Sequence, residues 1–112
     1  MAIVLQAETP PLRQEESGAL RVGESRVLVE LVIQEFLDGA TPEAIAQRYP
    51  TATLADIYAV IAYYLRHRDE VEEYLRQREQ RADEVRQRIE RQQGDLADLR
   101  QRLLSRQRSG QG

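Results

Sequence analysis

The stretch TPEAIAQRYPTATLADIYAVIAYYLRHR, residues 41–68, contains two helix starts separated by one helix stop. Thr41 followed by Pro42 is typical of a capped helix that begins with proline, and Pro50 ends that helix. Thr53 is a second capping residue, with an acid three positions later as in a capping box. The stretch therefore predicts a helix, a short turn and a second helix, which is the outline of a helix-turn-helix.

Each helix of this outline is predicted to bury one apolar stripe. The inward residues of the first are Ile45, Ala46 and Tyr49, and those of the second are Leu54, Ile57, Tyr58, Ile61, Tyr64 and Leu65. A further helix is predicted just upstream, over residues 29–37, with Gly39 as its stop. Its stripe is Leu28, Val32, Ile33, Phe36 and Leu37. Three helices in this order predict a trihelical core.

The amino-terminal part predicts little regular structure apart from a small β-hairpin. In residues 19–29, ALRVGESRVLV, Leu20 and Val22 alternate with Ala19 and Arg21, Gly23 permits a turn and residues 26–29 return, which favours two strands joined by a turn. Residues 1–18 are expected to be a flexible lead-in, because Pro10 and Pro11 cannot donate to a strand ladder. Residues 19–68 are then one domain, formed by the hairpin and the three helices.

The carboxy-terminal part follows another rule, a heptad repeat over residues 69–104. Its a sites are Leu75, Ala82, Ile89, Leu96 and Leu103, and its d sites are Val71, Arg78, Val85, Gln92 and Leu99. This spacing predicts a long amphipathic helix of coiled-coil type, whose first two turns fold back on the domain. The last residues, 105–112, are expected to be a disordered tail.

Composition narrows the class of protein. The 112 residues carry a net charge of −3, with no lysine and no cysteine. Residues 1–65 hold nine acids and four arginines, whereas residues 66–112 hold ten acids and twelve arginines. The lack of cysteine excludes disulfides and fits a cytoplasmic location. No apolar run is long enough for a membrane span, and the amino terminus lacks the basic start of a signal peptide.

The residues resemble a known prokaryotic family, domain of unknown function 433, also described as VapB-like antitoxins. The resemblance covers about residues 20–79 and rests on six segments: Arg21-Val22-Gly23, Arg26-Val27, Asp38-Gly39, the run TPEAI at 41–45, Tyr49-Pro50 and residues 54–68. The family usually has Gly-Gly-Thr or Arg-Gly-Thr before the second hairpin strand, and this chain has Gly23-Glu24-Ser25 instead.

The resemblance implies a mainly all-α, homeodomain-like fold and a role in a toxin–antitoxin pair. In that role the chain would be an antitoxin that neutralises a PIN-like ribonuclease and regulates its own gene by binding DNA. Two alternatives remain open. One is a helix-turn-helix transcriptional regulator without a toxin partner, and the other is a structural adaptor that dimerises through its coiled coil.

DNA binding would fall on two groups of residues. Arg21, Arg26 and Arg48 could form a basic patch, and Thr51 and Thr53 precede the second motif helix, whose start meets base edges in a helix-turn-helix. The other residues expected to be exposed at that start are Ala52, Ala55, Asp56 and Ala59. None of these four is a strong base reader. Residues 1–65, with their excess of acids, also lack the basic surface that is usual in DNA-binding domains. A scaffold or dimer surface is the competing interpretation.

Partner binding would fall on the heptad helix. The residues predicted to meet a partner or a second copy are Val71, Leu75, Ala82, Val85, Ile89, Leu96, Leu99 and Leu103. A domain this small cannot cover the stripe beyond Ala82, so the stripe is expected to form a homodimeric coiled coil or to occupy a groove on a toxin. The sequence does not distinguish the two.

No residue pattern predicts catalysis, a cofactor or a metal. The single histidine, His67, lies between two arginines and is expected to be solvated or locally packed. The acid pairs are adjacent in sequence, at 69–70, 72–73 and 83–84, and adjacent residues on a helix point apart. We therefore expect a protein that is not an enzyme.

Overall fold

The computed structural model describes the backbone of residues 2–110 and the side chains of residues 2–106. Within them two short strands precede four helices: β1 (Leu12–Gln14), β2 (Leu20–Val22), α1 (Val29–Leu37), α2 (Pro42–Arg48), α3 (Leu54–Arg66) and α4 (Arg68–Gly110). The chain forms two compact units, Met1–Leu75 and Arg76–Gly112. The predicted fold class, mainly helical with a small amino-terminal hairpin and a long last helix, is confirmed.

α2 and α3 begin, and α1 ends, where the capping residues predict. The Thr41 hydroxyl accepts a hydrogen bond from the Ala44 amide at 3.2 Å, and the Thr53 hydroxyl accepts one from the Asp56 amide at 3.1 Å. Gly39, with φ of 100°, follows the last turn of α1 in a left-handed conformation that suits glycine. These local signals set the starts of α2 and α3 and the end of α1, while packing of the apolar faces supplies most of the stability of helices this short.

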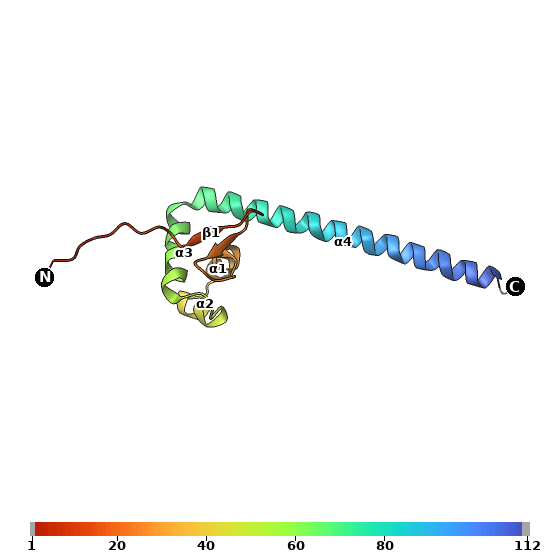
Figure 1. Cartoon of the computed structure of the whole chain (residues 1–112), viewed down its shortest axis with the longest axis horizontal. Coiled ribbons are helices and arrows are strands. Elements are labelled where there is room, and N and C mark those ends of the chain that lie inside the picture. Colours follow the sequence, from red (N-terminus) through yellow and green to blue (C-terminus); the bar gives the residue numbers. More distant parts are fainter. Residues whose placement is uncertain (1, 111–112) are drawn as a thin grey trace. The chain divides into compact units, whose positions relative to one another are not determined.

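The core of the first unit lies where α1, α2 and α3 meet one another and β2 (Figure 1). Its most deeply buried side chains are β-branched, and none is more than 2% exposed: Val22, Val29, Val32, Ile33, Ile45, Ile57 and Val60. Burying each of them stabilises the fold by about 1.5–3 kcal/mol. Four of these seven belong to the predicted helix stripes, whereas Val22, Val29 and Val60 do not, and the predicted Leu37 is 53% exposed.

The buried face of α3 differs from the predicted stripe. Ile57, Ile61 and Tyr64 are buried as expected, together with Val60. The predicted members Leu54, Tyr58 and Leu65 are instead 43%, 47% and 46% exposed. The reason is geometric: the neighbouring elements cover a face centred on Ile57 and Val60, and these three side chains lie at its margin.

The hairpin forms from other residues than predicted. β2 pairs in antiparallel fashion with β1, so that Leu12 lies opposite Val22, and the predicted return strand after Gly23 is reduced to an isolated bridge between Arg21 and Leu28. Pro11 is compatible with the pairing because it contributes only its carbonyl oxygen, which accepts a hydrogen bond from the Gly23 amide at 2.8 Å. Residues 12–14 of the predicted lead-in are therefore a strand.

Two predicted boundaries also differ from the structure. The first unit extends to Leu75 rather than ending at residue 68. α4 continues through Gly110, so the predicted disordered tail is helical over residues 105–110, and residues 111–112 lie outside the described part. Residues 105–108 are serine, arginine and glutamine with no proline, and arginine and glutamine favour a helix once it has started.

Candidate functional site

The turn that follows β2 is held by the side chain of Arg13, from β1, and by that of Ser25, within the turn itself. The guanidinium of Arg13 donates to the carbonyl oxygens of Gly23 (2.9 Å) and Ser25 (3.0 Å). The buried hydroxyl of Ser25 donates to the Val22 carbonyl at 2.6 Å and accepts from the Val27 amide at 3.2 Å. Ser25 thus supplies a hydroxyl at the position where the family pattern has threonine. The role of Arg13 was not predicted, because the strand β1 that carries it was not predicted.

This turn lies directly against the start of α3. Gly23 has φ of 52°, and a β-carbon added there would collide with the carboxylate of Asp56 in the first turn of α3. The helix-turn-helix therefore contacts the turn of the hairpin at Gly23, which has no side chain. The positive φ favours glycine at this position, and a β-carbon there would in addition make the Asp56 side chain rotate away.

Two arginines of the predicted DNA patch, Arg21 and Arg26, lie in one hydrogen-bonded cluster with the acid Glu15. Arg21 donates to Glu15 at 2.9 Å and to the carbonyl oxygen of Arg26 at 2.5 Å. The hydrogen bond from Arg21 lowers the pKa of Glu15, whose carboxylate also feels the charges of Arg13 and Arg26. The structure thus brings Arg21 and Arg26 together, but with a carboxylate in the same cluster.

The remaining predicted DNA residues lie around the turn between α2 and α3. Arg48, at the end of α2, forms an ion pair with Glu35 of α1 at 2.7 Å. Thr53 is occupied as the cap of α3, and Thr51 is exposed. Ala52 was expected to be exposed and is 5% exposed instead, as part of the core.

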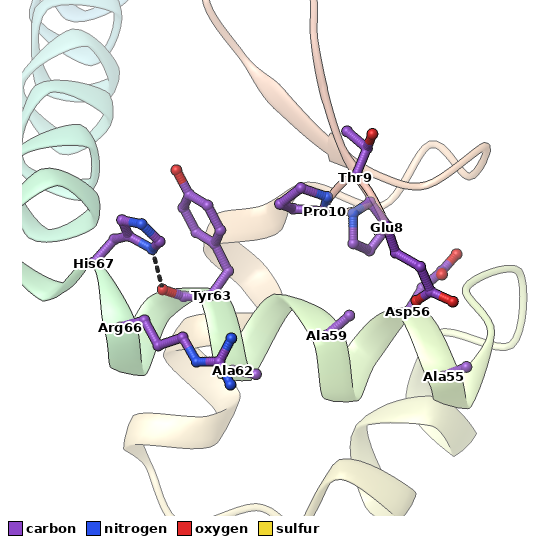
Figure 2. A pocket seen from close by; sticks show the side chains of 11 residues that line it. Glu8, Thr9, Pro10, Ala55, Asp56, Ala59, Ala62, Tyr63, Arg66 and His67 are labelled. Atoms are coloured by element: carbon purple, nitrogen blue, oxygen red, sulfur yellow. Dashed lines mark hydrogen bonds between the residues drawn. The ribbon is translucent and has the colours of Figure 1, made fainter. Parts of the chain in front are cut away.

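The outward face of α3 offers alanine rather than base-reading side chains. Ala55, Ala59 and Ala62 form the floor of a hollow of about 580 Å³ (Figure 2). The extended segment from Glu8 to Pro11 forms one wall, so that an acidic side chain stands near Asp56 at the start of the helix. Nearby, Tyr58 donates a hydrogen bond to Glu43, which lowers the pKa of Glu43 and raises that of Tyr58.

The other end of this hollow contains His67, Tyr63 and Arg66 (Figure 2). The rings of His67 and Tyr63 stack with their centroids 4.1 Å apart, and Nδ1 of His67 donates to the Tyr63 carbonyl oxygen at 3.1 Å. His67 also ends α3. The histidine is exposed and stacks on Tyr63, in line with the expectation of a solvated or locally packed side chain.

The first two turns of α4 belong to the first unit. Val71 is 6% exposed and Leu75 packs against the core. The Tyr74 hydroxyl accepts a hydrogen bond from the Leu20 amide at 2.8 Å, and Tyr64 donates to Glu72 at 3.1 Å. Burial, aided by the bond to Glu72, raises the pKa of Tyr64. Val71 and Leu75, both predicted partner contacts, are thus occupied by their own domain, as the predicted fold-back of these turns requires.

The heptad sites in the second unit are uncovered. The exposed fractions are 45% for Val85, 47% for Ile89, 64% for Leu96, 52% for Leu99 and 53% for Leu103, and Ala82 is exposed as well. We call these six residues the heptad stripe. An aliphatic side chain on a helix surface prefers to be buried by about 0.8 kcal/mol per methylene group. Among the described side chains of the second unit, the heptad stripe is therefore an apolar face left exposed.

The parts of the chain that the structure describes contain no group of three acidic or histidine side chains suited to a metal ion. Among the same residues, no helix combines the length and apolar character needed to cross a membrane.

The fold and these surfaces define a class of small helical domain, in which a helix-turn-helix is closed by a hairpin and by the root of a longer helix. Residues 16–64 match the model of the family described as "Protein of unknown function (DUF433)". The predicted family is thereby confirmed over these residues, while α4 lies outside the match. No curated protein and no solved structure matches the chain significantly.

Proposed function

We propose that this protein is an antitoxin-like interaction protein, which acts in the prokaryotic cytoplasm by binding other polypeptides and is not an enzyme. Its target in this proposal is a PIN-like ribonuclease. The observation that carries the proposal is the heptad stripe, in which apolar side chains at coiled-coil spacing are about half exposed. A regular stripe of this kind is characteristic of helices that are completed by another chain.

Two further features support a role in binding. The tyrosine, histidine and threonine side chains around α3 are engaged in caps, a ring stack and helix-to-helix hydrogen bonds, which are structural tasks. In addition, residues 66–112 combine twelve arginines with ten acids. Such a mixed surface sets which partner is accepted more than how tightly it is held. The ribonuclease itself is suggested only by the likeness to VapB-like antitoxins.

The test is co-expression with the PIN-like ribonuclease of the same operon, followed by pull-down and an RNA-cleavage assay. We expect the tagged chain to retain the ribonuclease and to suppress cleavage. The variant Leu96→Glu/Leu99→Glu should lose both effects, because each carboxylate would have to be desolvated in the interface. The matched control Gln87→Glu/Gln101→Glu adds the same charge on the opposite face of the helix and should behave like the wild type. Equal retention by both variants would refute the role of the heptad stripe.

A second candidate is a DNA-binding regulator, and the α2–turn–α3 arrangement favours it. Against it, three predicted contacts (Arg21, Arg48 and Thr53) are already occupied, and the outward face of α3 offers alanines beside Glu8 and Asp56. A gel-shift titration with the chain's own promoter distinguishes the candidates. A reader of DNA should bind with a Kd that weakens steeply as salt rises, and Arg26→Ala should reduce that salt slope.

A further inference from the structure

The heptad stripe continues over residues 82–103, and two d sites of the same repeat carry polar residues. Arg78 precedes it and Gln92 interrupts it, so the layers of any coiled coil built on α4 must accommodate both. The flanking e sites are Glu79, Arg86, Gln93 and Arg100, and the flanking g sites are Arg81, Arg88, Asp95 and Arg102. These two sets make it possible to compare partners and orientations by charge.

We propose that residues 78–103 of α4 bind the same residues of a second copy of this chain, running antiparallel. In the proposed register Arg78 lies opposite the second copy's Leu103, Val85 opposite its Leu96, and Ile89 opposite its Gln92. The two-fold axis passes between Glu90 and Arg91. This inference goes beyond ribonuclease neutralisation and rests on the proposed function only for the claim that the heptad stripe meets another polypeptide.

Flanking charges favour this arrangement. Turning one helix end for end places g sites beside g sites and e sites beside e sites. In the proposed register Arg88 then meets Asp95 and Glu79 meets Arg100, each twice by symmetry. Only one contact is repulsive, between Arg81 and Arg102, which also occurs twice. Each such exposed pair contributes little to the affinity, so the pairs together select an orientation rather than create the affinity.

The parallel dimer has a poorer set of contacts. There each g site meets the e site five residues later on the second copy. Asp95 then meets Arg100, but Arg81 meets Arg86, and no other pair carries two charges. Attraction and repulsion therefore cancel in the parallel dimer, whereas the antiparallel one keeps a surplus of attractive pairs.

Antiparallel registers shifted by one heptad are worse. One shift pairs Arg81 with Asp95, but it places Arg86 opposite Arg86 of the second copy and Arg88 opposite Arg88 of the second copy. The opposite shift places Asp95 opposite Asp95 of the second copy and pairs Arg88 with Arg102. The charges on α4 thus single out one register among the three.

The interior layers lead to the same result. A parallel dimer stacks Arg78 on Arg78 and Ala82 on Ala82, which places like charges together and leaves a space between two methyl groups. The antiparallel register lays the Arg78 side chain along Leu103, where its apolar stem packs and its guanidinium reaches water. It also places the small Ala82 against the large Leu99, which fills that layer.

Cysteine cross-linking tests the proposal, because the chain has no cysteine of its own. The full-length variants Val85→Cys and Leu96→Cys are oxidised separately and as a mixture. Disulfide partners need Cα atoms within about 7 Å. In the antiparallel dimer two copies of residue 85 stand 11 residues, or about 16 Å, apart along the axis. We therefore expect the mixture to yield a covalent dimer and each variant alone to yield none. Gln87→Cys, on the outward face, is the control for random collision.

A second measurement leaves the heptad stripe intact. A spin label at Gln80→Cys should lie about 32 Å along the axis from its counterpart in the antiparallel dimer, and at the same height in a parallel one. Light scattering on the unmodified chain should give the mass of a dimer. Efficient cross-linking of each single variant, or Gln80 labels at equal height, would overturn the orientation. A monomer at high protein concentration would overturn the dimer.

The two proposals fail in different ways. A chain that is monomeric alone yet retains the ribonuclease through the heptad stripe keeps the proposed function and removes the self-pairing. A chain that cross-links as expected but ignores the ribonuclease keeps the antiparallel dimer and removes the antitoxin role.

Discussion

Replacing Gly23 by alanine tests how the hairpin supports the helix-turn-helix. Two costs add at this position. A left-handed backbone is unfavourable for alanine by about 1–2 kcal/mol, and the new methyl group must displace the Asp56 carboxylate, the end of a side chain that can rotate away at a cost of up to about 1 kcal/mol. We expect the free energy of unfolding to fall by about 1–3 kcal/mol, a sizeable share of the stability of a domain this small.

The second cost can be separated from the first. Asp56→Ala removes the atoms that the methyl group would meet and leaves the β-carbon, which stands 4.0 Å from the added methyl position in ordinary contact. In that background Gly23→Ala should cost only the backbone share of about 1–2 kcal/mol. The difference between the two costs measures the close approach of the turn to α3.

Denaturant unfolding followed by tyrosine fluorescence suits this measurement. All five tyrosines lie between residues 49 and 74, in the first unit, so melting of the second unit does not contribute directly. An equal cost of Gly23→Ala in both backgrounds would refute the contact with Asp56. A cost below about 0.5 kcal/mol would refute the left-handed turn as well.

The remaining predictions concern single side chains of the first unit. Thr53→Ala should lower the free energy of unfolding by about 1 kcal/mol through loss of the α3 cap, while Thr51→Ala, on an exposed side chain, should change it by less than about 0.5 kcal/mol. Ile57→Ala should cost about 2–5 kcal/mol, and Leu65→Ala, at the margin of the core, only about 0.5 kcal/mol; equal costs would contradict the observed face of α3. Because the pKa of Tyr64 is raised, the unfolded chain loses this proton first, so stability should fall as pH rises above the ordinary value of 10.0. Tyr64→Phe should weaken that alkaline loss in pH-dependent unfolding, and an unchanged profile would exclude Tyr64 as its source.

Local signals made the helices of the first unit predictable. Thr41, Thr53 and Gly39 each act on the backbone within a few residues, so their effect can be inferred from a single segment. The pairing of β1 with β2 depends on the turn that ends at Gly18, where φ is 91°. Ser17-Gly18 is a turn signal that the neighbouring prolines obscured.

Contacts between distant segments were less predictable. The burial of Val60 rather than Leu54 depends on which side of α3 the other elements cover, and periodicity allows neighbouring faces almost equally. The pairing of Arg48 with Glu35 likewise requires α1 and α2 to be placed first. The heptad spacing of α4, in contrast, was evident from the sequence because it repeats without reference to any other element.

The hydrogen bond from the Leu20 amide to Tyr74 joins residues 54 positions apart. Since the chain is synthesised from its amino terminus, the hairpin must wait for almost the whole of the first unit, including the root of α4, before this bond can form. A nascent chain that has only reached the end of α3 still exposes the surface that Val71 later covers. Folding of the first unit is therefore completed only after the root of α4 has been synthesised, and the same helix carries the heptad stripe.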